Sequence, residues 1–327
     1  MPTPSYILSI ISFSARPQTE ILAFDNFIDY IDSQDESERQ ANMKMNNKPQ
    51  IGITIDHFKG IKPPQLLKIV NRLGLEFVEI TESVFEDLTE MKKNLGNIQT
   101  GFHLPNLHDA GYDFSDRKHQ PDIRRLIGLI NTHHQQLNIN YCLSHPPEGK
   151  HNKSDFESAS HYLLENLQQL KPPVLIENVQ NISESQFRQF YSLAREKMGE
   201  HLLGQCFDAA HYLLSGNDPL EFVNRADGEV KCFHLSDCKA NLDAHLPFGR
   251  GGELPIEEIL SAIKQTGFQG YINLELLPRS MQDVKPLIDS YLQVVRTFNC
   301  VKFITTKFRL IFYSSLIKKY IKGAFLN

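Results

Sequence analysis

Eight short apolar runs, separated by helical patterns, set what this chain can fold into. Most of these runs are continuously apolar, as in strands that are buried on both faces. Buried strands that alternate with helices indicate a parallel sheet, and eight such units favour closure into a (β/α)8 barrel. The predicted strands are Ile51–Asp56, Phe77–Thr81, Thr100–Leu104, Tyr141–Ser144, Val174–Glu177, Leu203–Asp208, Val230–Leu235 and Tyr271–Leu276.

An open, doubly wound sheet is the structural alternative to the barrel. Such a sheet normally carries a glycine-rich phosphate-binding turn after its first strand. Here that turn reads Asp56-His57-Phe58-Lys59-Gly60, which lacks the pattern. The sequence therefore favours the barrel and offers no motif for a dinucleotide cofactor.

Several of the intervening helices have recognisable ends. The helices predicted over residues 64–73, 183–198 and 255–266 are each followed directly by a glycine, which is a stop signal. The helix predicted over Ser154–Leu170 begins with a serine and has Glu157 three residues later, the spacing of a capping box.

Most of the later strands end in a residue that can bind a metal ion. Ionisable groups at the ends of buried strands are costly unless they coordinate or catalyse something. In a parallel barrel the carboxyl ends of all strands meet at one mouth, where such enzymes keep their active sites. Six strand ends of this kind therefore predict a shared metal site. Its candidate ligands are His103, His145, Glu177, Asp208 with His211, His234 and Glu275.

The two glutamates are the strongest of these candidates. A lone histidine at a strand end is more often a hydrogen-bonded core residue than a ligand, and this applies to His103 and His145 taken singly. Glu177 and Glu275 lie in such apolar strands that their carboxylates are expected to be paired or coordinated. Together with an aspartate and an imidazole, they suit a divalent ion such as Mn²⁺, Mg²⁺, Co²⁺ or Zn²⁺.

Two pairs of residues extend this set by their spacing. Asp208 and His211 are three residues apart across a strand-to-helix turn, which lets both side chains face the mouth. Asp243 and His245 alternate, which places two donors on one side of an extended loop. Alternatively, Asp243 and Asp237 are caps of their loop.

The composition fits one α/β domain in a reducing compartment. The net charge of -5 gives no general attraction for nucleic acid. The five cysteines include no C-x-x-C pair. Three of them lie in predicted core strands, where a free cysteine behaves as a small hydrophobe. A cytoplasmic location is the expectation.

Both ends of the chain differ from the barrel pattern, which spans residues 50–299. Residues 1–49 are predicted to form a flexible extension. Its apolar stretch 6–15 resembles a signal peptide, but no Lys or Arg precedes it, and Met43 or Met45 is an alternative natural start. Residues 300–327 form a basic and apolar tail without an acidic residue. We expect this tail to pack on the barrel, to be disordered, or to contact an anionic membrane weakly as an amphipathic helix.

The ordered set of candidate residues resembles the xylose-isomerase-like TIM barrel superfamily. That superfamily includes sugar-phosphate isomerases and epimerases, and also the endonuclease IV class of abasic-site nucleases. The resemblance covers about residues 51–299. It rests on the series His103, His145, Glu177-Asn178, Asp208-x-x-His211, His234-x-x-Asp237, Asp243-x-His245-Leu-Pro-x-Gly and Glu275.

This resemblance implies a (β/α)8 barrel with divalent ions at its mouth. The epimerase branch implies a principal ion held by Glu177, Asp208, His234 and Glu275. The nuclease branch implies a second ion held by His103, His145 and Glu177, and a third held by His211, Asp243 and His245. The chain departs from the nuclease branch after His103, where it reads Leu-Pro-Asn and lacks the tyrosine of the DNA-facing surface.

The first functional interpretation is a metal-dependent isomerase or epimerase of a small sugar or sugar-derived substrate. Glu177 and Glu275 would be catalytic, moving the proton next to a carbonyl. His211 and Arg250 would bind the substrate, although Arg250 is equally well explained by a pair with Glu253. The alternatives are an endonuclease IV-like zinc phosphodiesterase, acting on abasic DNA or a small phosphodiester, and a non-catalytic barrel that binds a ligand. Barrels of this type commonly associate, so a homo-oligomer is one of the oligomeric states that the sequence leaves open.

Overall fold

The computed structural model describes residues 48–58, 61–148, 153–226, 228–239, 242–277 and 281–314. Several predictions concern residues outside these ranges. They are the apolar stretch 6–15, the alternative starts Met43 and Met45, and the tail beyond residue 314. The side chain of Ser154, and with it the predicted capping box, also falls outside the description. Among the described residues, no helix is long and apolar enough to cross a membrane.

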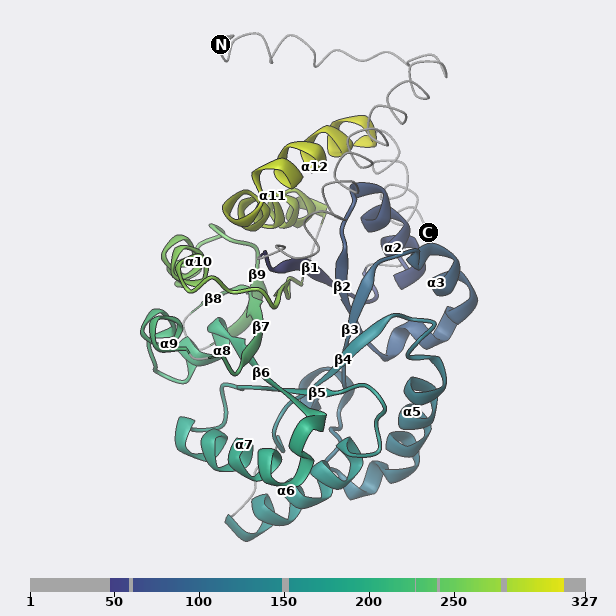
Figure 1. Ribbon diagram of the computed structural model, residues 1–327, viewed down its shortest axis with the longest axis vertical. Coiled ribbons are helices and arrows are strands. Elements are labelled where there is room, and N and C mark those ends of the chain that lie inside the picture. Colours follow the sequence, from purple (N-terminus) through teal and green to yellow (C-terminus); the bar gives the residue numbers. More distant parts are fainter. Residues whose placement is uncertain are drawn as a thin grey trace. The chain divides into compact units, whose positions relative to one another are not determined.

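Eight parallel strands close into a barrel, as predicted (Figure 1). Their order around the barrel is β1-β10-β7-β6-β5-β4-β3-β2, so that β1 pairs with both β2 and β10. Each strand overlaps one of the predicted apolar runs. The strands are β1 (Gln50–Ile55), β2 (Phe77–Ile80), β3 (Gln99–His103), β4 (Ile139–Ser144), β5 (Val174–Glu177), β6 (Leu202–Asp208), β7 (Val230–Leu235) and β10 (Tyr271–Leu274).

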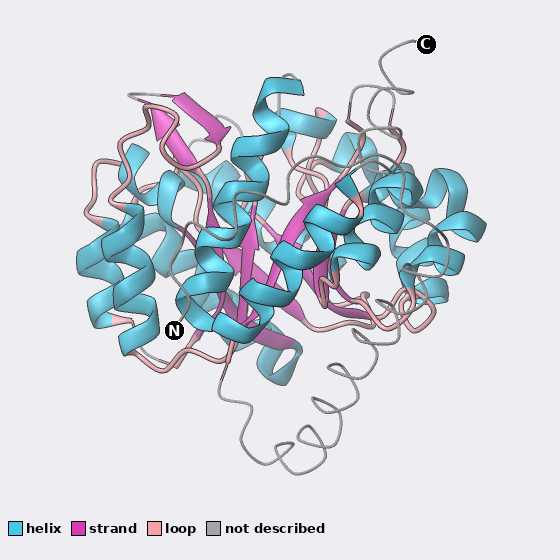
Figure 2. Cartoon of the chain, turned by 90° about the horizontal axis from the view of Figure 1, so that it is seen from above, coloured by secondary structure: helices cyan, strands magenta, loops and turns pink. Residues whose placement is uncertain are grey.

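Helices surround these strands (Figure 2). The first of them, α2, buries Leu67 and Val70 against the barrel and ends at Gly74, which adopts the left-handed conformation. A capping box forms at Ser183 and Gln186, at the start of α7. The main helices are α2 (Pro63–Leu73), α3 (Leu88–Leu95), α5 (Gln120–His133), α6 (Lys153–Leu167), α7 (Glu184–Met198), α10 (Ile256–Gln265) and α11 (Met281–Phe298). Shorter ones are η3 (Glu82–Asp87), α4 (Leu107–Ala110), η4 (Arg117–His119), η5 (Gly199–His201), α8 (Ala209–Leu214) and α9 (Pro219–Arg225).

An antiparallel hairpin that the sequence did not predict is inserted between β7 and α10. Its strands are β8 (Asp237–Lys239) and β9 (Leu242–Leu246). The hairpin follows the carboxyl end of β7 directly. It therefore brings the loop residues Asp243 and His245 to the mouth of the barrel.

The side chains inside the barrel change from apolar to ionisable toward the carboxyl ends of the strands. Its apolar part is a cluster of Phe77, Tyr141, Leu143, Leu175, Cys206 and Cys232. Gly101 makes this packing possible, because a Cβ there would lie 2.4 Å from the Tyr141 ring. The cysteines predicted to lie in core strands are buried, as expected. The ionisable side chains occupy the part nearer the carboxyl ends.

The helix α12 (Cys300–Phe312) includes the described part of the basic tail and packs against α11 and α2. Lys302 donates to the Glu76 carboxylate at 2.8 Å, and Thr306 is buried. Glu76 directly precedes β2, so this contact lies near the amino end of that strand, away from the mouth. The exposed apolar residues of α12 are Val301, Ile304, Phe308 and Ile311.

Truncation after Asn299 is expected to leave the metal content of the protein unchanged, because α12 contacts the end of the barrel opposite the candidate ligands. Thermal stability should fall modestly, since a surface ion pair contributes at most about 1 kcal/mol and four large apolar side chains of α12 remain exposed. Metal analysis and thermal unfolding of both chains check this. A folded, truncated protein that has lost its metal would contradict it.

Weak membrane contact through residues 300–327 stays a prediction. It requires binding to anionic vesicles that weakens with added salt and disappears on truncation after Asn299. Neutral vesicles of the same size are the control. Binding that is insensitive to salt and lipid charge would contradict an electrostatic contact.

Candidate metal centre

Four predicted ligands meet at the carboxyl ends of neighbouring strands. Glu177 and Asp208 end β5 and β6, His234 lies near the end of β7, and Glu275 directly follows β10. One ligand atom from each lies within 4.8 Å of the others. Ligands on opposite sides of one ion, at bond lengths of about 2.0–2.3 Å, are about 4–4.6 Å apart. The spacing of this principal set therefore fits a single divalent ion.

Buried carboxylate oxygens without hydrogen bonds support the same fit. Glu177 Oε1 and Asp208 Oδ2 are both buried and have no hydrogen-bond partner. His234 Nδ1 and His211 Nδ1 lie 3.3 and 3.4 Å from Glu177 Oε1, but neither has hydrogen-bond geometry. An unpartnered buried carboxylate oxygen is costly, and a cation between these oxygens removes that cost.

A second group shares Glu177 with two histidines. His145 Nε2 and His103 Nε2 lie 3.2 and 3.7 Å from Glu177 Oε2. The Nδ1 atom of His103 donates to the Leu104 carbonyl at 2.8 Å, and that of His145 pairs with Glu148. These contacts direct both Nε2 atoms toward the centre, as partners of metal-binding histidines typically do.

A third group joins His211 to two residues of the hairpin strand β9, Asp243 and His245. His211 Nε2 and His245 Nε2 lie 2.8 and 3.2 Å from the same oxygen of Asp243. Their Nδ1 atoms contact backbone carbonyls, those of Asn178 at 2.9 Å and of Glu275 at 3.2 Å. His245 has a φ of 43°, a strained backbone for a residue other than glycine that is typical of functional sites. The other Asp243 oxygen is buried without a hydrogen bond.

The histidines of these groups favour the ionised form of the neighbouring glutamates. Burial alone would raise the pKa of Glu177, but His234 and His145 hold it well below its usual range. Burial also opposes ionisation of Glu275, whose pKa His245 and His234 lower to about 2. Asp208 differs, because burial raises its pKa to about 6. The centre thus holds two firmly ionised glutamates.

A buried carboxylate that the sequence did not predict lies behind His234. Glu79, in β2, is fully buried and accepts hydrogen bonds from Tyr141 at 3.1 Å and Asn273 at 2.8 Å. Its Oε2 also lies 2.8 Å from His234 Nε2, although this contact lacks hydrogen-bond geometry. The opposite ring nitrogen of His234 lies 2.9 Å from Glu275. The negative charge of Glu79 favours a proton on Nε2, which leaves Nδ1 for the ion.

The Glu79→Gln variant is expected to bind the metal about 10–100-fold more weakly, because it removes the charge that orients His234. Competition with a chelator measures this affinity. Glu82→Gln is a matched control from the carboxyl end of β2, since Glu82 pairs with Arg125 and Tyr112 outside the centre. Equal metal affinity of both variants and the parent protein would contradict the orienting role.

Two other loop residues have different surroundings. Asp237 accepts hydrogen bonds from the backbone of Cys238 at 3.0 Å and Leu254 at 3.1 Å, so it caps its loop, which was one of the two alternatives. Arg250 is half-exposed, and its guanidinium lies 3.7 Å from Asp283 of α11. Arg250 is therefore not part of the ligand cluster, and its contact with substrate stays a prediction.

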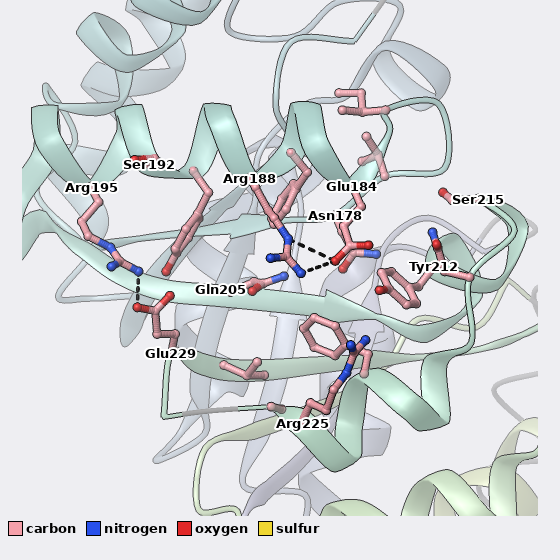
Figure 3. A pocket seen from close by; sticks show the side chains of 18 residues that line it. Asn178, Glu184, Arg188, Ser192, Arg195, Gln205, Tyr212, Ser215, Arg225 and Glu229 are labelled. Atoms are coloured by element: carbon pink, nitrogen blue, oxygen red, sulfur yellow. Dashed lines mark hydrogen bonds and ion pairs between the residues drawn. The ribbon is translucent and has the colours of Figure 1, made fainter.

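One cavity among the described residues opens onto the centre. A cavity of about 420 Å³ includes His103, His245 and Glu275 in its wall. A pocket of about 410 Å³ lies on the flank of the barrel, between α7, β6 and α9 (Figure 3). Its arginines are paired with glutamates, as in Arg188–Glu184 and Arg195–Glu229. No ligand of the three groups lines this flank pocket, so the first cavity is the candidate substrate site.

Comparison with protein families gives a match to the xylose isomerase-like TIM barrel over residues 67–297. The chain belongs to this family. Among curated proteins, no relative matches. The family assignment confirms the superfamily predicted from the order of strand-end residues.

Solved structures of the same fold come from proteins with different activities. The IOLI protein with a bound zinc atom is 16% identical, with a TM-score of 0.59 over 76% of this chain and 99% of that one. AP endonuclease, family 2, from Brucella melitensis is 14% identical, with a TM-score of 0.57 over 72% and 95%. D-psicose 3-epimerase from Clostridium cellulolyticum H10 is 14% identical, with a TM-score of 0.53 over 81% and 98%. At these identities the similarity shows the fold alone, and the reaction must be argued from the site.

Proposed function

We propose that this protein is a divalent-metal-dependent isomerase or epimerase that acts on a small sugar or sugar-derived substrate. The observation that carries the proposal is the pair Glu177 and Glu275. Both belong to one set of ligand atoms within 4.8 Å, and the pKa of both is lowered. Two ionised carboxylates at one ion site suit proton transfer next to a carbonyl.

Each residue of the centre has a different role in this reaction. A bound divalent ion supplies electrostatic stabilisation of the charge that develops on the substrate oxygens. Glu275 borders the cavity and accepts the proton from the substrate carbon. Glu177 is ionised, so the proton for the other face would come from His145, whose pKa is raised to about 10 and whose Nε2 lies 3.2 Å from Glu177; Glu177 would relay it to the substrate carbon. His211, which Asp243 holds in place, would orient a substrate hydroxyl.

Metal analysis and a substrate screen test this function. One exchangeable manganese or magnesium ion per chain, with turnover of a ketose, an aldose or one of their phosphates, is the expected result. The panel includes an oligonucleotide with an abasic site and a small phosphodiester. Turnover of these phosphodiesters alone would overturn the proposal.

A zinc phosphodiesterase of the endonuclease IV type is the second candidate. Two groups that share Glu177 have the spacing for an ion each, and His211 and His245 both contact Asp243 nearby, which favours a site with more than one ion. Close to three zinc ions per chain, with cleavage of a phosphodiester, would support this alternative. If the protein retains no metal after purification with added metal, a non-catalytic barrel that binds a ligand replaces both.

A further inference from the structure

The cavity at the metal centre has two chemically different ends. The end at the centre includes His103, His245 and Glu275. Polar side chains from the ends of β1 and β2 and from the loop after β3 extend this wall, among them Thr81 and Asn106. These groups can bind a polar head that carries adjacent oxygens.

The opposite end of the cavity lies between α2 and α11, the two helices that flank β1 (Figure 1). All seven lining residues from these two helices are aliphatic. They are Leu66, Ile69, Val70, Leu73, Val284, Leu287 and Ile288. Ile53 and Ile55 of β1 add to the same wall. The described residues of this end therefore include no side chain that can hydrogen-bond sugar hydroxyls.

The bridged residues Phe58 and Ile61, and the residues after β10, connect the two parts of the cavity. Phe58 and Ile61 exchange backbone hydrogen bonds of 3.1 and 2.7 Å, which hold both side chains at the cavity wall beside β1. Leu276 and Leu277 directly follow the ligand Glu275 and also line the cavity. Leu277 is 56% exposed, so a large apolar side chain faces open space next to the centre. The apolar lining thus begins beside the metal ligands.

We propose that the substrate carries an alkyl chain or an aromatic ring beside its metal-binding oxygens, and that the α2–α11 end of the cavity binds this apolar part. The inference rests on the proposed function for the polar head. A polyhydroxylated substrate alone would place hydroxyls against aliphatic walls without partners, which is unfavourable. A substrate that is polar at one end and apolar at the other matches both parts of the wall.

Two hydroxamates that differ only in chain length test the proposal on the full-length protein loaded with Mn²⁺. Acetohydroxamate and octanohydroxamate present the same two adjacent oxygens to the ion. Calorimetry is expected to show at least about 30-fold tighter binding of octanohydroxamate, since each buried methylene adds about fourfold in affinity. Equal affinities of the two compounds would overturn the proposal.

Variants in the apolar wall of the cavity test whether this wall causes the tighter binding of octanohydroxamate. Ile69→Asn is expected to reduce the preference for octanohydroxamate to about threefold or less, while acetohydroxamate affinity and metal content stay unchanged. The isosteric Val284→Thr should reduce the preference in the same direction and does not change side-chain size. Ile304→Asn, at an exposed apolar position of α12, should have no effect. A preference that survives Ile69→Asn and Val284→Thr would place the apolar chain elsewhere and contradict the proposal.

The same experiment separates this inference from the proposed function. If acetohydroxamate binds the metal-loaded protein and octanohydroxamate binds no more tightly, the apolar subsite is contradicted. The metal site is then still supported. A protein that retains no Mn²⁺ and binds neither hydroxamate contradicts the proposed function, and the apolar subsite with it.

Discussion

The Glu275→Gln variant is expected to lower kcat by roughly 10²–10⁴-fold on any substrate found in the screen, because it removes the general base. The amide is nearly the same size but cannot accept the proton. It is also a weaker ligand, so the affinity for the ion should fall. Steady-state kinetics at saturating metal separates the two effects, because kcat then reports the loss of the base.

Glu257→Gln is the matched control for this variant. Glu257 is exposed in the first turn of α10, outside the centre. It should leave both kcat and metal affinity unchanged. Full activity of Glu275→Gln at saturating metal would remove Glu275 from the mechanism and would contradict the isomerase assignment.

The free energy of unfolding of the metal-free protein is expected to decrease as the pH rises from about 6.5 to 9. Burial opposes protonation of His145 and His245, but Glu177 and Glu148 raise the pKa of His145 to about 10, and Glu275 and Asp243 raise that of His245 to about 9. Without metal, the folded protein therefore binds more protons than the unfolded chain above the ordinary histidine pKa of 6.5. Its stability must then decrease with pH in this range.

The Glu275 carboxylate determines how the stability of the metal-free protein changes at acid pH. Because the pKa of Glu275 is lowered to about 2, its contribution is complete above its ordinary value of 4.5 and is lost as the pH falls toward 2. Taken together, these groups stabilise the metal-free protein most between about pH 4.5 and 6.5.

Metal binding should reverse the alkaline trend, since the ion binds neutral imidazoles and ionised carboxylates and displaces protons. An ion at 100 times its Kd adds about 2.7 kcal/mol, and the Kd itself should decrease as the pH rises. Thermal unfolding at pH 6.5, 7.5 and 9, with and without a chelator, measures both trends. If the stability of the metal-free protein rises across this range, the histidines of the folded protein are neutral and the electrostatic picture is wrong.

Much of the barrel could be predicted because its strands are buried on both faces. Runs such as Val174–Glu177 and Val230–Leu235 are mostly apolar, and their observed bounds equal the predicted ones. The clustering of ligands could also be predicted, because parallel strands bring their carboxyl ends together regardless of loop details.

Other features depend on contacts that spacing does not encode. Glu79 was not predicted, because it lies within β2 and not at its end. The criterion that selected Glu177 was a carboxylate in an apolar strand, and Glu79 meets this criterion equally well. The hairpin of β8 and β9 is too short for its strands to show a pattern. The apolar cavity arises from the spacing of α2 and α11, which the sequence of either helix alone does not determine.

The closure of the barrel has a consequence for how the chain is made. Gln50 of β1 pairs with Tyr271 of β10, and Glu275 is the last ligand of the principal set. Synthesis from the amino end therefore delivers β1 first and its closing partner last. Until β10 leaves the ribosome, the barrel has two open edges, at β1 and β7, and the candidate ion site lacks Glu275. These edges stay exposed, and the candidate site stays incomplete, until nearly the whole barrel has been translated.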